Sequence, residues 1–80
     1  MKIVVLDTFE KVEDTLKARY FLETLPDDVG YIKVSRDGSV LDCQKIESDN
    51  GTDEYFKVAK NALLQTFNFD PLPIKTFIQA

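Results

Sequence analysis

Three carboxylates near a turn, Asp49, Asp53 and Glu54, are the residues of this chain best suited to holding a metal ion. Carboxylate oxygens are the ligands that a hard cation such as Ca²⁺ prefers, but the spacing of these three does not match an EF-hand loop. Acidic residues in the first turn of a helix stabilise it without any ligand. We therefore interpret the cluster as a solvated helix start and predict no bound metal.

The usual catalytic residues are missing from the sequence. It contains no histidine, the commonest general base, so its single cysteine, Cys43, has no histidine partner to activate it as a nucleophile. The three glycines form neither of the glycine-rich loops that hold phosphate groups. We predict that the protein is not an enzyme and binds no cofactor, and that Cys43 is a small buried side chain.

Composition and charge are those of a small globular domain. The 80 residues make a single domain, residues 1–80, and 44% hydrophobic with 30% charged residues argue against disorder. The formal net charge of −4 disfavours nucleic acid as a partner, because phosphate binding needs a basic patch. No apolar run approaches the roughly 18 residues of a membrane span, so we expect no membrane insertion. We expect a cytoplasmic protein if the chain is complete, and a periplasmic one if it is excised from a longer anchored protein.

Residues 31–44 predict a β-hairpin around Asp37 and Gly38. An Asp-Gly pair between alternating apolar residues is typical of a two-residue type I′ turn. That loop places Lys33 opposite Asp42, whereas a three-residue loop would place Lys33 opposite Leu41 and mix the two faces. The predicted inward-facing side chains are Ile32, Val34, Leu41 and Cys43. The outer face then carries one aromatic, Tyr31, which falls short of the stacked aromatics of RNA-binding domains.

Apolar spacing and helix stop signals predict the other elements. Residues 2–6, rich in β-branched side chains, are predicted to form a strand, and residues 74–79 a last strand after two prolines. Residues 8–25 are predicted to form a first helix, and a second helix is predicted to begin after Thr52, its N-cap. Helical spacing in residues 8–25 is carried by Phe9, Val12, Leu16, Tyr20, Phe21 and Leu25, and in the second helix by Phe56, Ala59, Leu63 and Phe67.

The resulting order is β-α-β-β-α-β, that of the ferredoxin-like fold. We expect an α+β protein whose antiparallel sheet carries two helices on one face, with the first strand inside the sheet and the last at an edge. The alternative, α-β-β-α-β, leaves the first strand out of the sheet.

From Tyr20 onward, an ordered set of short motifs resembles the C-terminal domain of the TonB and TolA energy-transducing proteins. The set comprises Tyr20 with Leu25 and Pro26 on and after a helix, residues 30–40 entering an Asp-Gly-x-Val turn, residues 46–48 with Gly51, the helix at residues 56–64 with Ala59 and Ala62, and the segment of Phe67, Phe69, Pro71 and Pro73. The chain departs from the family's pattern where Asp49 and Asn50 lengthen a turn, where Phe56 stands in place of an Asp, and in the added strand at residues 3–6.

This resemblance implies a binding domain that pairs an exposed edge strand with a segment of a protein partner. The candidate partner-binding residues are Ile74, Lys75, Thr76, Phe77, Ile78 and Gln79. Self-association remains open. One alternative is a small acidic regulatory or inhibitory protein, of the kind that bacterial phages or plasmids encode to block a host protein. A further alternative is a small-ligand sensor domain.

Overall fold

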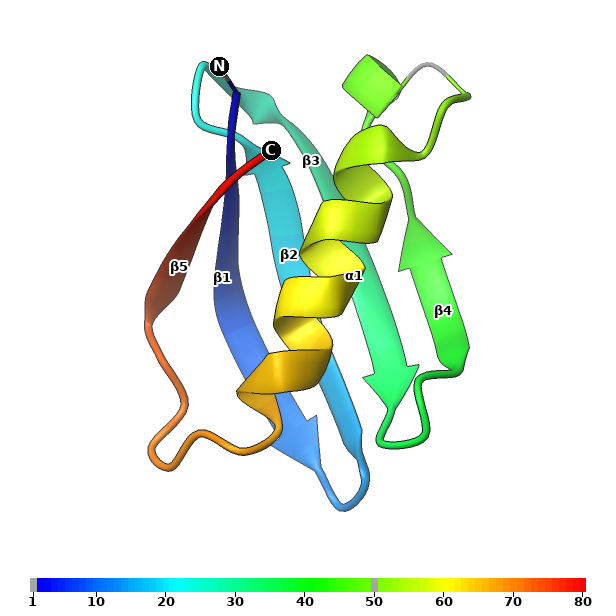
Figure 1. Cartoon of the computed structure of the whole chain (residues 1–80), viewed down its shortest axis with the longest axis vertical. Coiled ribbons are helices and arrows are strands. Elements are labelled where there is room, and N and C mark those ends of the chain that lie inside the picture. The colour runs from blue at the N-terminus through cyan, green and yellow to red at the C-terminus, as the bar shows by residue number, and fades with distance from the viewer. Residues whose placement is uncertain (1, 50) are drawn as a thin grey trace.

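The computed structural model describes residues 2–49 and 51–80, and there it contains five strands, one α-helix and one short 3-10 helix. In chain order these are β1 (Ile3–Val12), β2 (Thr15–Leu22), β3 (Leu25–Ser35), β4 (Val40–Gln44), the 3-10 helix η1 (Glu47–Asp49), α1 (Glu54–Thr66) and β5 (Lys75–Gln79) (Figure 1). The fold is α+β, as predicted.

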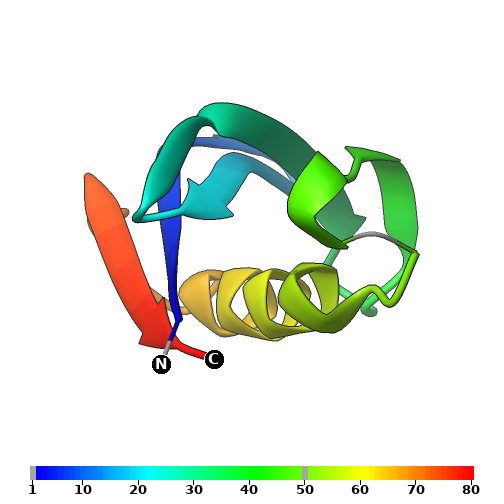
Figure 2. The same ribbon diagram turned by 90° about the horizontal axis from the view of Figure 1, so that it is seen from above.

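All five strands form one antiparallel sheet in the order β4-β3-β2-β1-β5. The first four strands form a meander, and the chain then crosses one face of the sheet as α1 before β5 pairs with β1. Seen from above, the sheet curves around the helix, with β5 and β4 at its two ends (Figure 2). The first strand therefore lies inside the sheet and the last at an edge, as predicted. The two-helix arrangement is not observed.

Residues 8–25, predicted to be a helix, instead form the end of β1, a turn, β2 and the start of β3. The buried side chains of β2 follow a period of two: Leu16, Ala18, Tyr20 and Leu22. Leu16 and Tyr20 are four residues apart, which satisfies both a helical and an alternating pattern, so they do not distinguish the two. β2 pairs with a strand on each side, and this tertiary pairing outweighs local helical spacing.

The β3–β4 hairpin has the predicted pairing at its base but a different turn. Lys33 lies opposite Asp42, as expected. The loop, however, has three residues, because the Ser35 amide donates to the Ser39 carbonyl at 2.9 Å and the Gly38 amide donates to the Ser35 carbonyl at 3.0 Å. Gly38 has a φ of 96°. This is a type I turn followed by a left-handed glycine, and the prediction of a type I′ turn is wrong.

A bulge at Leu41 compensates for the extra loop residue. The pairing shifts between Lys33 and Val34, so that Val34 lies opposite Val40. Loop and bulge each add one residue, which is why the pairing beyond them is unchanged. Ile32 and Val34 are buried as predicted, but Leu41 is 51% exposed rather than inward-facing, and Cys43 is only half-buried.

α1 covers the concave face of the sheet with the predicted stripe. Phe56, Ala59, Leu63 and Phe67 are buried in one core with side chains of β1, β2 and β3, chiefly Val4, Leu6, Leu16, Tyr20, Ile32 and Val34. Close packing of these apolar side chains supplies the main stabilisation of the domain.

The start of α1 is held mainly by Asp49, whereas Thr52, the predicted N-cap, accepts one long bond from the Glu54 amide at 3.4 Å. The Oδ1 atom of Asp49 accepts hydrogen bonds from the amides of Tyr55 at 2.8 Å and Phe56 at 3.3 Å. Its Oδ2 atom accepts one from the Tyr20 hydroxyl at 3.0 Å, and that hydroxyl in turn accepts one from the Ile46 amide at 3.1 Å. Asp49 is 2% exposed, so this network satisfies polar groups inside the core and ties η1 to both the helix and the sheet.

Candidate functional site

β5 is the edge strand predicted to bind a partner. Five of the six predicted residues form it, and Ile74 immediately precedes it. It pairs on one side with β1, and among residues 2–49 and 51–80 no strand lies on its other side. An edge strand presents a row of unpaired backbone amides and carbonyls to which another chain can bond.

Two hydrogen bonds show which way the backbone of β1 faces. The Ala80 amide donates to the carbonyl of Lys2 at 2.9 Å, so Lys2 faces β5. The Glu23 amide donates to the carbonyl of Ile3 at 2.9 Å, so Ile3 faces the opposite way, towards β2. Residues that face each neighbour alternate along a strand of an antiparallel sheet.

The same alternation determines which backbone groups of β5 are free. The backbone amides and carbonyls of Val4 and Leu6 point towards β5, where these residues lie opposite Ile78 and Thr76. The amides and carbonyls of these two β5 residues are therefore used by β1. The residues whose amides and carbonyls point away from the sheet are Lys75, Phe77 and Gln79.

Side chains of β5 alternate between the two faces of the sheet. Thr76 and Ile78 share the face of the buried Leu6 and Val4, which is the face that α1 covers. Phe77 lies opposite Val5 on the outer face and is 57% exposed. Each residue with free backbone groups thus carries its side chain on the outer face.

A groove of about 330 Å³ lies between β5 and α1 on the covered face. A strand added beside β5 would continue the pleat, so its residues opposite Thr76 and Ile78 would point their side chains towards this groove. The groove is lined by Val58, Asn61, Ala62, Gln65, Thr66, Phe69, Thr76 and Ile78.

Exposed apolar side chains gather around the same edge. Ile74 is 90% exposed, Phe77 57% and Phe69 50%. Single exposed apolar residues are ordinary, but three beside an open strand and an apolar groove are typical of an interaction surface.

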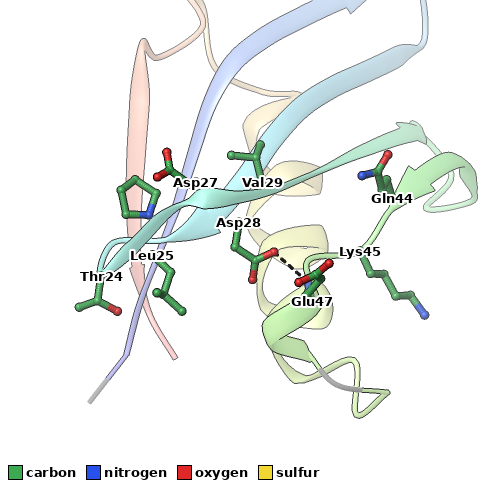
Figure 3. Close-up of a pocket in the computed structure, with 9 residues that line it drawn as sticks. Thr24, Leu25, Asp27, Asp28, Val29, Gln44, Lys45 and Glu47 are labelled. Atoms are coloured by element: carbon green, nitrogen blue, oxygen red, sulfur yellow. Dashed lines mark hydrogen bonds between the residues drawn. The ribbon is translucent and has the colours of Figure 1, made fainter.

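A second cavity, of about 590 Å³, lies where β3 begins and the chain leaves β4 (Figure 3). It is lined by Thr24, Leu25, Pro26, Asp27, Asp28, Val29, Gln44, Lys45 and Glu47. Figure 3 shows Asp28 directed towards Glu47, and Lys45 directed away from both. Lys45 bonds instead to Asp53, with its Nζ 2.7 Å from Oδ1, and this contact raises the pKa of Lys45.

The carboxylate of Asp28, which lines this cavity, is hydrogen-bonded within the protein. It accepts hydrogen bonds from the Ser48 hydroxyl at 2.6 Å and from the amides of Glu47 at 2.9 Å and Ser48 at 3.0 Å. The pKa of Asp28 lies below its usual value, mainly because of the hydrogen bond from the Ser48 hydroxyl and next because of the one from the Glu47 amide. These bonds fasten η1 to β3, so the carboxylate of Asp28 has a structural role.

The outer face of the sheet is crossed by paired charges. Arg19 donates two hydrogen bonds of 2.9 Å to Asp7, and this contact lowers the pKa of Asp7. Tyr31 donates to Asp42 at 3.1 Å, while the Lys17 ammonium lies 4.8 Å from the centre of its ring. Lys17 therefore covers one side of the Tyr31 ring.

The three carboxylates noted in the sequence do not converge. Asp49 caps α1 from within the core, Asp53 pairs with Lys45, and Glu54 is exposed. Among residues 2–49 and 51–80, no group of three or more acidic, histidine or cysteine side chains could hold a metal ion.

Sequence reasoning missed the groove beside β5. Ala62 was predicted only as a small residue of the second helix, and Phe69 only as part of a segment before the last strand. Their common position is set by where β5 docks beside the helix. The available signal was the width of the stripe, since it extends beyond the residues that one face of a sheet covers.

No family model, curated protein or solved structure matches this chain. Within the described residues, no helix has the length and apolar character needed to cross a membrane.

Proposed function

We propose that this protein is a non-enzymatic interaction module that binds an extended segment of a protein partner along the free side of β5. The observation that carries the proposal is the coincidence of free backbone groups at Lys75, Phe77 and Gln79 with an adjoining groove. In such binding the backbone hydrogen bonds provide affinity, and pockets for alternate side chains provide specificity.

The two faces of β5 would contact different side chains of a partner. Partner residues opposite Thr76 and Ile78 would reach the groove, where Val58 and Ala62 leave room for apolar side chains of moderate size. Partner residues opposite Phe77 would lie on the outer face against its exposed ring. We therefore expect the preferred segment to have apolar residues at alternate positions.

The resemblance to the TonB and TolA C-terminal domains supports the same mode of binding, since that family is expected to pair its edge strand with a partner. A small regulatory or inhibitory protein would use the same edge and differ only in its target. A small-ligand sensor would use the cavity beside β3, and the engagement of Asp28 within the protein argues against that use.

A library of linear peptides displayed on phage tests the proposal even though the partner is unidentified. Peptides selected on the immobilised protein would be synthesised and their affinities measured for the native protein and for Phe77→Pro and Phe77→Ala. Proline removes the outward amide, so we expect Phe77→Pro to weaken binding at least about 100-fold, equivalent to about 2.7 kcal/mol. Alanine keeps the amide and should cost less than about tenfold.

Hydrogen exchange locates the bound peptide. The amides of Phe77 and Gln79 should gain protection on peptide addition, because they would donate to the new strand. Undiminished affinity in a folded Phe77→Pro variant, or new protection confined to other elements, would refute binding at this edge.

A further inference from the structure

We infer that the strand which pairs with β5 is β5 of a second copy of this chain, antiparallel to the first about a two-fold axis at Phe77. The inference rests on the proposed edge-strand function and names its partner. It joins two five-stranded sheets into one continuous sheet with both helices on the same face.

The free backbone groups restrict the register, and the overlap of the two strands selects one. Residues with outward groups must pair with one another, which here restricts hydrogen-bonded pairs to Lys75, Phe77 and Gln79. Complete overlap of two antiparallel copies of Lys75–Gln79 centres the axis on the middle residue, Phe77. An axis at Lys75 would oppose two lysines, and one at Gln79 would leave most of each strand unpaired.

The side chains of β5 are self-complementary in this register. Lys75, the only charged residue in the strand, falls opposite Gln79 of the second copy, so no like charges meet. The two Phe77 rings lie side by side on the outer face, where each is 57% exposed in the single chain. Aromatic pairs opposite each other in a sheet are favourable.

On the face covered by α1, the side chains of the two copies are also complementary. Thr76 lies opposite Ile78 of the second copy, which brings two copies of Ile78 onto the face of the groove. Because the sheet curves around α1, the added strand would extend that curve past the open side of the groove (Figure 2). The exposed Phe69 at the groove would then face apolar side chains instead of water.

We expect this association to be reversible and weak. A pair of five-residue strands buries less area than a standard interface of about 1,600 Å². The net charge of −4 on each copy adds a repulsion that salt screens, so the dimer should strengthen as ionic strength rises.

Sedimentation velocity of the full chain, from about 10 μM to about 1 mM, tests the inference, because this range brackets weak association. The native protein should shift from monomer towards dimer. Phe77→Lys and Phe77→Glu each place like charges together at the axis, and each should weaken self-association at least about 100-fold. An equimolar mixture of the two variants pairs opposite charges at the same point, and should restore a dimer that contains one of each.

Lys75→Gln is the matched control. It changes the net charge of each copy by the same amount as Phe77→Glu, opposes no like charge to Asp7 of β1, and lies opposite Gln79 of the second copy, so its dimer affinity should stay within a few-fold of native. A thermal melt of every variant separates loss of pairing from loss of folding. In a mixture of isotope-labelled and unlabelled native chains, an intermolecular contact between the Hα atoms of Thr76 and Ile78 should appear, because they form a non-hydrogen-bonded pair.

Three results would overturn the inference: a native monomer at about 1 mM, the top of the tested range; an undiminished dimer in Phe77→Lys; or no dimer in the mixture. If the native chain is monomeric yet selected peptides still protect Phe77 and Gln79, the second copy is rejected and the edge-strand function stands. If self-association depends on Phe77 while no peptide binds β5, both the dimer and edge pairing stand, and a foreign partner is rejected.

Discussion

The two edge strands, β4 and β5, have five residues each, yet only one of them offers a regular surface for pairing. The pairing of β5 with β1 runs without interruption, whereas the pairing of β4 with β3 is shifted by the bulge at Leu41. Bulges twist an edge and interrupt its row of backbone groups, which protects it from unintended pairing. Exposed apolar side chains do not explain the difference, because Val40 and Leu41 on β4 are exposed too.

The two edges are also anchored differently. The chain just after β4 is held by the buried bonds among Ile46, Tyr20 and Asp49, and by Asp28. β5 is held by its backbone pairing with β1 and by Ile78, which packs against the core. The comparison shows that an edge is closed by local distortion and by buried hydrogen bonds, and in the described part of the chain β5 has neither. Substitutions that loosen the anchored side while leaving β5 unchanged therefore test the difference.

Replacing Asp49 should have the largest effect. Asp49→Ala removes the cap of α1 and leaves the buried Tyr20 hydroxyl without its acceptor, which together should cost about 2–4 kcal/mol in the free energy of unfolding. Denaturant unfolding measures the loss. Asp49→Asn keeps an oxygen acceptor and should lose less. Equal stability of the alanine variant and the native protein would contradict the anchoring role.

Gly30→Ala should be next in size. A Cβ at Gly30 would lie 2.2 Å from the Gln44 carbonyl oxygen and 2.8 Å from Cε1 of Tyr20, so β4 would have to move away from β3. We expect a loss of about 2–3 kcal/mol in thermal or denaturant unfolding. The control is Gly51→Ala, whose Cβ would have nothing within 4 Å and would carry only the strain of a φ of 82°. If the two variants lose equally, the close approach at Gly30 is not the cause.

The β3–β4 turn should show a smaller effect. Gly38 has a φ of 96°, and the atom nearest to an added Cβ is Cδ1 of Leu64 at 4.0 Å. The cost of a substitution there therefore comes from backbone strain rather than from a clash. A β-branched residue is strongly disfavoured there, and Gly38→Val should cost about 1–2 kcal/mol. Gly38→Asn tolerates the left-handed region better and should lose about half as much. An unchanged melting temperature for the valine variant would show that the turn can reform without the glycine.

The smallest effect should be on how the stability depends on pH, through Asp28. Its pKa in the folded protein lies below its usual value, because of the bonds from Ser48 and Glu47. The carboxylate therefore stabilises the fold above about pH 4, the unfolded value, and this contribution is lost as pH falls through the folded pKa. Asp28→Asn should melt lower than native at pH 7, and the gap should narrow below about pH 4. The exposed neighbour Asp27, changed to Asn, should leave the melting temperature nearly unchanged; an equal loss there would assign the effect to general charge.

Local signals in the sequence were sufficient for α1, for the base of the hairpin and for β5. The stripe from Phe56 to Phe67 lies on one helical face and is followed by prolines, which leaves little freedom in the choice of element. Residues 8–25 were ambiguous, because Leu16 and Tyr20 fit both periods, and the two strands flanking β2 decided between them. Of the candidate site, the sequence indicated the strand and its edge position but neither the groove nor the free backbone groups.

By itself, the sequence determined which segments are apolar, where turns and prolines interrupt them, and that no histidine or phosphate loop is present. These properties belong to single residues and near neighbours. Only the tertiary structure decided that Phe77 rather than Thr76 turns its amide outward, since that depends on which residues of β1 face β5. It also decided that Asp49 caps a helix from within the core, because its partners come from β2 and α1. Both outcomes depend on pairing between residues distant in the chain, and the local sequence leaves that pairing undetermined.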